Sequence, residues 1–172
     1  MTTDKIDFFL ENEAATEQLA KSLADIILPQ CPADSQYQGV SAATLHLSGD
    51  LGAGKTAFAR AFLRHCGVTG RIKSPTFALI EPYNVSRINF YHIDFYRFSD
   101  PREWADAGFR DLYQPDSILL IEWPEKAAGV LPEPDIHIQL TVQGDSRMAQ
   151  LDARTARGTK WLDILKTKCP RL

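Results

Sequence analysis

The spacing of apolar and polar residues predicts alternating strands and helices through most of the chain. Apolar residues recur at helical spacing from Ala15 to Ile27, and Asn12 is placed to cap this helix at its N-terminus. A short edge strand is expected just before it, at Asp7–Leu10, and a strand with alternating leucines at 44–48. The uninterrupted apolar run Ile118–Ile121 is typical of a buried central strand. This order of elements favours an α/β fold.

Two β-hairpins are predicted in the rest of the chain. They pair the segments Phe77–Tyr83 with Ile88–Tyr96, and Ile136–Val142 with Met148–Ala153. The first hairpin is expected to turn within residues 82–87, and the second at Gly144 and Asp145. Antiparallel hairpins beside the apolar central strands predict a mixed parallel and antiparallel sheet.

Helices are also expected from Asp100 onwards, with Pro101 in the first turn, and around Trp161. Residues 30–43 contain proline, glycine and serine among polar neighbours, and they predict an exposed, flexible loop.

Composition describes an ordinary globular protein. The 172 residues are 44% apolar and 24% charged, so we expect a single domain over residues 1–172. No apolar run is long enough to span a bilayer, and acidic Asp4 stands where a signal peptide would be basic. We therefore expect a cytoplasmic protein without membrane contact. The cysteines, Cys31, Cys66 and Cys169, are too widely spaced to suggest a disulfide framework or a zinc site.

Charge is spread unevenly along the chain. The net charge is −3, yet residues 154–172 hold six basic residues against the single acid Asp163. A strong basic surplus, expected of an independent nucleic-acid binder, is absent. The basic C-terminal helix or tail, about residues 156–172, has two interpretations. It is a solvated helix whose cations favour the helix dipole, or it contacts RNA or an acidic partner.

The most specific motif is a glycine-rich segment between the strand at 44–48 and an amphipathic helix ending near Gly67. It fits the pattern G-x-x-x-x-G-K-[ST] with Gly49, Asp50, Leu51, Gly52, Ala53, Gly54, Lys55 and Thr56. Backbone N–H groups of such a loop curl around phosphate oxygens, and the helix N-terminus adds further donors. Lys55 is then expected to bridge the β- and γ-phosphates, and Thr56 to offer its hydroxyl to Mg²⁺. The motif predicts a three-layer P-loop domain with a mixed sheet.

Two carboxylates are candidates for the chemistry beside the phosphates. Glu122 follows the strand at Ile118–Ile121 and is expected to coordinate Mg²⁺ directly or through water, or to polarise the attacking water. Asp94 shares a strand face with His92 and is expected to hold a metal-bound or nucleophilic water. The alternatives are an ordinary carboxylate at a strand end and a surface acid paired with Arg97.

Other residues are further candidates for this site. Thr76, in the turn after the P-loop helix, is a candidate sensor of the γ-phosphate, or else it belongs to a turn that enters a strand. Trp123 is expected at the active surface because it follows Glu122. The histidines His46, His65 and His137 are interpreted as surface or satisfied core residues. No Asn-Lys-x-Asp tetrad occurs to select guanine, so adenine is the favoured base.

Several segments together resemble the bacterial TsaE family of small P-loop ATPases, which are needed for threonylcarbamoyladenosine in tRNA. They run in the family's order over roughly residues 8–140: Gly49–Thr56, Ser74–Phe77, Glu81–Tyr83, Tyr91–Arg97, Asp100–Glu103, Ile121–Glu125 and Gly129–Pro132.

The resemblance implies a protein that binds ATP or ADP with Mg²⁺ and hydrolyses ATP slowly when alone. It implies the partners TsaB and TsaD, which carry out the threonylcarbamoyl transfer, with hydrolysis resetting that complex and tRNA contacted only indirectly or weakly. The family's functional residues fall on Lys55, Thr56, Asp94, Glu122 and Trp123, and more weakly on the nucleotide contact Glu13.

Two other functions remain open from the residues. A small-molecule P-loop kinase needs the same loop and metal together with a basic lid, for which Arg97, Arg102 and Arg110 are available. The other is a binding module that responds to the nucleotide but does not hydrolyse it at a useful rate.

Overall fold

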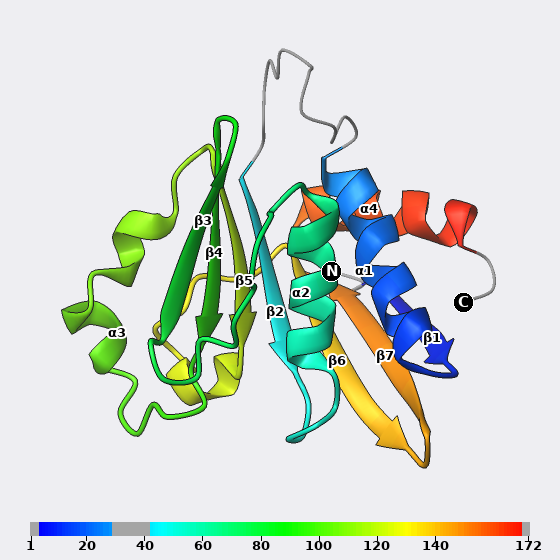
Figure 1. Cartoon of the computed structure of the whole chain (residues 1–172), viewed down its shortest axis with the longest axis horizontal. Coiled ribbons are helices and arrows are strands. Elements are labelled where there is room, and N and C mark those ends of the chain that lie inside the picture. The colour runs from blue at the N-terminus through cyan, green and yellow to red at the C-terminus, as the bar shows by residue number, and fades with distance from the viewer. Residues whose placement is uncertain (1–3, 29–41, 170–172) are drawn as a thin grey trace.

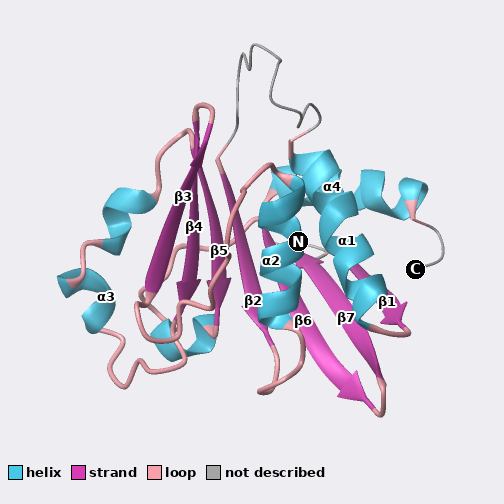
Figure 2. Cartoon of the chain, viewed as in Figure 1, coloured by secondary structure: helices cyan, strands magenta, loops and turns pink. Residues whose placement is uncertain are grey.

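The computed structural model describes residues 4–28 and 42–169. They form a mixed seven-stranded sheet with helices packed against it (Figures 1 and 2). The strands are β1 Lys5–Leu10, β2 Ala43–Ser48, β3 Ile80–Val85, β4 Ile88–Asp94, β5 Ser117–Glu122, β6 Ile136–Gln143 and β7 Ser146–Ala153. The helices are α1 Glu13–Ile27, α2 Lys55–His65, α3 Glu103–Asp106 and α4 Ala156–Lys168, with 3₁₀ turns η1 Phe109–Leu112 and η2 Pro124–Ala127.

The strand order is β1-β7-β6-β2-β5-β4-β3. The centre is parallel, because β2 pairs in parallel with both β5 and β6, and β5 with β4. Antiparallel pairs flank it, with β3 against β4 on one side, and β7 between β6 and β1 on the other. The predicted mixed sheet and the edge position of β1 are thus confirmed.

The two faces of the sheet carry separate apolar clusters, as the two-residue period of a strand requires. On β5, Ile118 and Leu120 join the cluster formed with α1, α2 and α4, whereas Leu119 and Ile121 join aromatic residues from α3 and η1. Among these aromatics, Trp104 stacks on Phe109 with ring centroids 5.0 Å apart. Structured segments therefore cover both faces, which confirms the predicted α/β class.

Local signals were accurate at the ends of helices. The side chain of Asn12 accepts a hydrogen bond from the backbone N–H of Ala15 at 3.1 Å and caps α1, as predicted. Gly67 follows the end of α2 with φ of +96°, the left-handed conformation expected of a glycine just beyond a helix.

The structure differs from the prediction at the first hairpin turn and at the helix expected from Asp100. Residues 82–85 belong to β3, so the first hairpin turns only at Ser86 and Arg87. Pro82 is accepted because β3 is an edge strand, where one missing N–H breaks no ladder. The helix expected from Asp100 is the four-residue α3. Most of the predicted loop at 30–43, with Cys31, lies outside the described residues.

The basic C-terminal segment is helical from Ala156 to Lys168, and residues 170–172 are not described. Two of its arginines form ion pairs with carboxylates of the fold. Arg157 donates to the buried carboxylate of Asp135, with Nη2 at 2.7 Å from Oδ2, and Arg154 pairs with Asp152 at 2.8 Å. Within the described residues, no helix combines the length and apolarity needed to cross a membrane.

Candidate nucleotide-binding site

The glycine-rich loop joins the end of β2, at Ser48, to the start of α2, at Lys55. Gly49 has φ of +141°, and a Cβ there would collide with the backbone carbonyl of Leu140. Gly54 precedes the helix with φ of +107°. Both positions require glycine, and the loop leaves the first N–H groups of α2 without side-chain caps. The geometry is that of an anion-binding helix N-terminus.

Lys55 lies across this loop. Its ammonium donates to the carbonyl oxygens of Gly49 at 2.6 Å and Asp50 at 2.9 Å, and it lies 4.0 Å from the centroid of the Trp123 ring. Burial lowers the pKa of Lys55, and the carboxylates of Glu122 and Glu125 are the strongest opposing influences. A phosphate bound in the loop could therefore take the place of these carbonyl oxygens as the hydrogen-bond acceptor of the Lys55 ammonium.

Glu122 is anchored from two sides. The hydroxyl of Thr56 donates to its two carboxylate oxygens at 2.9 and 3.0 Å. The imidazole of His92 lies 2.7 Å from Oε1 and, because a carboxylate only accepts, must donate from Nε2. The side chains of Glu122 and His92 are 2% and 0% exposed, so the pair is shielded from solvent. The last residue of β5 is therefore held toward the first turn of α2.

Asp94 stands beside Glu122 in the sheet, since the two residues are register partners in the parallel pair β4–β5. Its carboxylate accepts from the Thr76 hydroxyl at 2.8 Å and from the Tyr96 N–H at 2.9 Å. Burial raises the pKa of Asp94, and the nearby charge of Glu122 acts in the same direction. The alternative pairing with Arg97 is wrong, because that guanidinium instead lies 4.1 Å from the ring centroid of Phe77.

These groups open into one cavity of about 320 Å³. The predicted site residues that line it are Glu13, Leu51, Gly52, Gly54, Lys55, Thr56, Thr76, Asp94, Glu122 and Trp123. Gly49, Asp50 and Ala53 belong to the same loop but do not line the cavity. Trp123 has φ of +56°, a conformation uncommon for a bulky residue, and its ring also packs against Tyr96 with centroids 5.2 Å apart.

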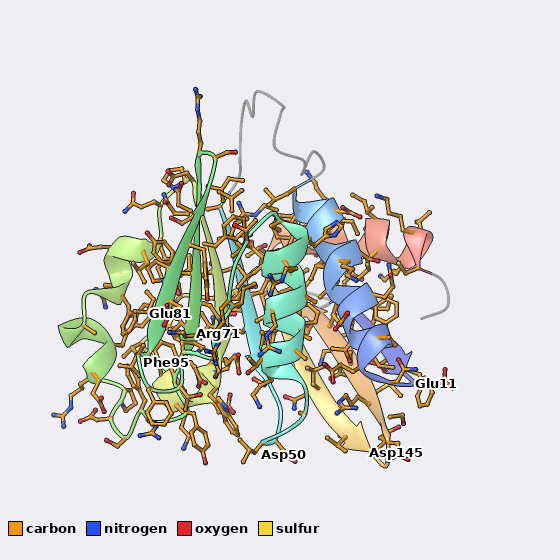
Figure 3. All side chains as sticks on the ribbon, viewed as in Figure 1. Glu11, Asp50, Arg71, Glu81, Phe95 and Asp145 are labelled. Carbon is orange, nitrogen blue, oxygen red and sulfur yellow. The ribbon has the colours of Figure 1, made fainter. Side chains whose placement is uncertain are left out.

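Sequence reasoning missed one cation in this cavity. Arg147, at the start of β7, donates from Nε to the carbonyl oxygen of Ala53 at 3.1 Å and lines the same space. Figure 3 shows Asp50 of the glycine-rich loop and Asp145 of the β6–β7 turn at the same end of the molecule. No local motif marks Arg147, because only the pairing of β6 with β7 brings it to the loop.

The basic lid of a kinase does not assemble from the predicted arginines. Arg102 is exposed and its guanidinium pairs with Asp100 at 2.6 Å, while Arg97 lies over Phe77. None of Arg97, Arg102 and Arg110 lines the cavity. The structure therefore adds no support to the interpretation as a small-molecule kinase.

The donor set fits a magnesium ion. The Thr56 hydroxyl and the Glu122 carboxylate are hard oxygen donors in mutual contact, and the Asp94 carboxylate lies beside them. Burial and the charge of Glu122 raise the pKa of Asp94, and a cation bound here would offset both effects. In the described part of the chain, no group of three or more His, Cys, Asp or Glu side chains forms a metal centre. A site with two protein donors is what Mg²⁺ uses when phosphates complete its shell.

Comparison with known proteins gives a consistent result. The family model described as threonylcarbamoyl adenosine biosynthesis protein TsaE matches residues 10–150. The TsaE protein of Haemophilus influenzae is 39% identical over 150 residues, covering 87% of this chain and 90% of that protein. The Rickettsia felis protein of the same name is 37% identical over 80% of this chain and 74% of its own length. The crystal structure of Bacillus subtilis YdiB matches with a TM-score of 0.71 and 25% identity, covering 98% of both chains.

Proposed function

The chain belongs to the TsaE family, and from this premise we propose that it is a magnesium-dependent ATPase in the threonylcarbamoyl modification of tRNA adenosine. The observation that carries the proposal is the contact between Thr56 and Glu122 at the mouth of the glycine-rich loop. It places a hydroxyl and a carboxylate together beside the lysine that phosphates would engage.

In this proposal the chain first binds the phosphates of the nucleotide. The N–H groups of the loop and of the first turn of α2 surround them, and Lys55 transfers its hydrogen bonds from the loop carbonyls to phosphate oxygens. Arg147, which contacts the carbonyl oxygen of Ala53, adds a second positive charge to the same cavity. No tetrad for guanine occurs in the sequence, which supports ATP over GTP.

Thr56 and Glu122 would hold Mg²⁺. When bound, the ion neutralises the charge that develops on the phosphates. His92 keeps the Glu122 carboxylate directed toward α2 through a buried hydrogen bond. Asp94 accepts hydrogen bonds from Thr76 and Tyr96, which fix the orientation of its carboxylate. Because its pKa is raised, Asp94 is a better proton acceptor than an ordinary carboxylate and is our candidate for orienting the attacking water.

The rim of the cavity supports a role for protein partners. Leu51 and Phe77 are 75% and 83% exposed, and Tyr96 is 42% exposed. Leu51 and Tyr96 line the cavity, and Phe77 follows the lining residue Thr76. Large apolar side chains exposed around one opening are typical of a docking surface. We propose TsaB and TsaD as the proteins that cover it, with Trp123 at the junction and tRNA reached through them.

The deciding experiment is ATP turnover by the purified protein alone, with TsaB–TsaD, and with TsaB–TsaD plus tRNA. The expected result is slow turnover alone and stimulation by the pair, with Lys55→Ala inactive in every mixture. A panel of small metabolites replaces the partners in a parallel assay. Stimulation by a metabolite together with its phosphorylation would establish a kinase instead. Full tRNA modification by Asp94→Asn without hydrolysis would establish a nucleotide-dependent binding module.

A further inference from the structure

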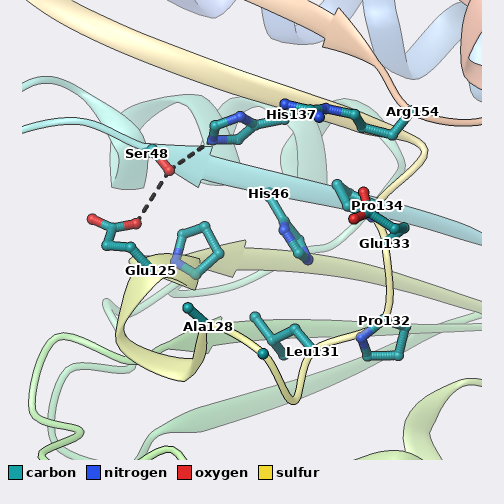
Figure 4. Close-up of a pocket in the computed structure, with 12 residues that line it drawn as sticks. His46, Ser48, Glu125, Ala128, Leu131, Pro132, Glu133, Pro134, His137 and Arg154 are labelled. Atoms are coloured by element: carbon teal, nitrogen blue, oxygen red, sulfur yellow. Dashed lines mark hydrogen bonds between the residues drawn. The ribbon is translucent and has the colours of Figure 1, made fainter. Parts of the chain in front are cut away.

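A second cavity, of about 280 Å³, lies on the other face of the sheet (Figure 4). It is bounded by β2, by β6 and by the segment of residues 124–134 that follows β5. On β2 the odd residues Leu45 and Leu47 join the core with α1 and α2, so His46 and Ser48 point the opposite way. None of the residues that line this cavity lines the nucleotide cavity.

His46 lines the cavity with an unused hydrogen-bonding atom. Its side chain is 7% exposed, and its Nε2 is buried without a hydrogen-bond partner in the described structure. Burial, with a contribution from neighbouring His137, lowers the pKa of His46 to about 3. The interpretation of His46 as a satisfied core residue is therefore wrong. A buried polar atom without a partner is costly, and a ligand that pairs with it recovers that cost.

Ser48 connects a second histidine to a carboxylate, as the dashed lines in Figure 4 show. Its hydroxyl donates to Oε2 of Glu125 at 3.2 Å, and Nε2 of His137 lies 2.8 Å from the same Ser48 oxygen. Since the single hydroxyl proton goes to Glu125, His137 must donate from Nε2. Burial lowers the pKa of His137, so this imidazole is also favoured in its neutral form. The chain orients Glu125 at the cavity wall.

Charge at this cavity is negative. Glu125 and Glu133 both line it, and neither forms an ion pair with a cation among the described residues. The one cationic side chain of the lining, Arg154, is occupied by Asp152 at 2.8 Å. The opening therefore presents two carboxylates that have no directly paired cation among the described residues, although the Lys55 ammonium also acts on Glu125 from farther away. Such a site attracts a cation and repels phosphate or carboxylate ligands.

The remaining walls are apolar. They consist of prolines and aliphatic residues: Pro124, Leu131, Pro132 and Pro134. Pro132 and Glu133 are exposed while Pro134 and His46 are buried, so the cavity runs from an open rim to a buried floor. A suitable occupant thus has an apolar stem and a cationic head with several donors.

We propose that this cavity is a second binding site, which takes the guanidinium group of an arginine side chain presented by a partner protein. Guanidinium offers five donors in a rigid plane, which suit the carboxylates of the lining and the free nitrogen of His46, and its stem packs on the prolines. Lysine offers a compact, strongly hydrated charge that fits fewer of these acceptors. A side chain suits the open rim, because the backbone of the partner stays outside.

The test is a titration of the full chain with Nα-acetyl-arginine-N-methylamide, followed by the imidazole proton signals of His46 and His137 in NMR spectra. We expect saturable one-to-one binding that shifts both histidines. The double variant Glu125→Gln/Glu133→Gln should weaken binding by at least about tenfold, since the cavity loses both of its negative charges and with them any charge-assisted hydrogen bond to the guanidinium. Glu17→Gln is the matched control, because that partly exposed glutamate lies on α1, does not line the cavity, and pairs with Lys21 in the described structure.

Three further probes make the assignment specific. The citrulline analogue, which is neutral and has nearly the same shape, should bind at least about tenfold more weakly, and the lysine analogue should bind more weakly than arginine. Equal binding of citrulline, an unaffected double variant with a native circular dichroism spectrum, or no histidine shift at the solubility limit of the probe overturns the proposal. Free arginine binding tenfold more tightly than the blocked probe would identify a site for a small molecule and overturn the assignment to a side chain.

Discussion

The hydroxyl of Thr56 lies 2.9 Å from a carboxylate oxygen of Glu122, although the two residues are 66 positions apart in the chain. The sheet explains this closeness. Leu47 near the end of β2 is the register partner of Glu122 at the end of β5, and α2 begins a few residues after β2. The two side chains therefore meet at the carboxyl edge of adjacent parallel strands, where α/β folds generally bind ligands.

Replacing Glu122 by glutamine should weaken the binding of Mg²⁺ while leaving the binding of the nucleotide itself largely unchanged. The amide can still accept from Thr56, but it lacks the charge that Mg²⁺ requires. We expect ADP affinity without Mg²⁺ to change little and Mg²⁺ affinity in the presence of ADP to fall at least about tenfold. Calorimetric titrations at several Mg²⁺ concentrations measure both. Unchanged metal dependence would contradict the assignment of Glu122 as a ligand.

Lys55→Ala should weaken ATP binding by about tenfold to a hundredfold, because one charge-assisted hydrogen bond contributes roughly 1.5–3 kcal/mol. Fluorescence titration with a labelled ATP analogue measures the loss. Lys126→Ala is a suitable control, since that exposed lysine lies on η2 and does not line the nucleotide cavity. Equal affinities of wild type and Lys55→Ala would refute the proposed role of the lysine.

Much of the clustering of residues at the candidate site could be predicted from the sequence, because it rests on local signals. The spacing of Gly49, Gly54, Lys55 and Thr56 is a loop-to-helix motif whose backbone geometry is largely intrinsic. The position of Glu122 could be predicted because an apolar strand ends there in an acidic residue. Parallel strands bring their carboxyl ends to the same edge of a sheet, so the closeness of Glu122 to the glycine-rich loop could be predicted without the exact strand register.

Other features depend on packing between distant segments and carry no local signal. Arg147 reaches the loop only because β7 returns antiparallel beside β6. His46 is buried beside the segment that follows β5, and this contact between distant parts of the chain has no local signal either. The predicted turn of the first hairpin begins too early, because proline and asparagine generally favour turns. Here they lie within β3, which accepts a proline because it is an edge strand.

Arg147→Ala should lower nucleotide affinity by about tenfold through the loss of one charged donor near the phosphates. Its hydrogen bond to Ala53 also holds the loop, so Arg147→Lys serves as the second variant and should recover part of the affinity. The same fluorescence titration applies. Affinity unchanged in Arg147→Ala would show that the guanidinium only supports the loop.

Gly158→Ala should destabilise the fold without touching the nucleotide site. A Cβ at Gly158, in the first turn of α4, would collide with the backbone carbonyl of Asp135. Asp135 also accepts from the backbone N–H of Thr44 at 3.0 Å, so the strain reaches the start of β2. We expect a loss of about 1–3 kcal/mol in urea unfolding, against little change for exposed Lys160→Ala. Equal stabilities would contradict the tight packing of α4 on this carbonyl.

The buried imidazole of His46 should make stability depend on pH. Its pKa is about 3 in the fold and near 6.5 when unfolded, so between these values only the unfolded state binds the proton. Stability contributed by neutral His46 is therefore present above pH 6.5 and lost as the pH falls toward 3. The slope reaches at most about 1.4 kcal/mol per pH unit.

His46→Gln removes this titration and should reduce the slope of the unfolding free energy against pH by up to about 1.4 kcal/mol per pH unit. Its cavity neighbours His137, Glu125, Glu133 and Arg154 are present in both proteins, so the difference between the two profiles reports the titration of His46 together with its coupling to His137. Urea unfolding at pH 7, 5.5 and 4.5 supplies the comparison. A difference that stays constant across this range would mean that His46 gains its proton as readily in the folded protein as in the unfolded chain. The assignment of His46 as a buried, neutral imidazole on the floor of the second cavity would then be wrong.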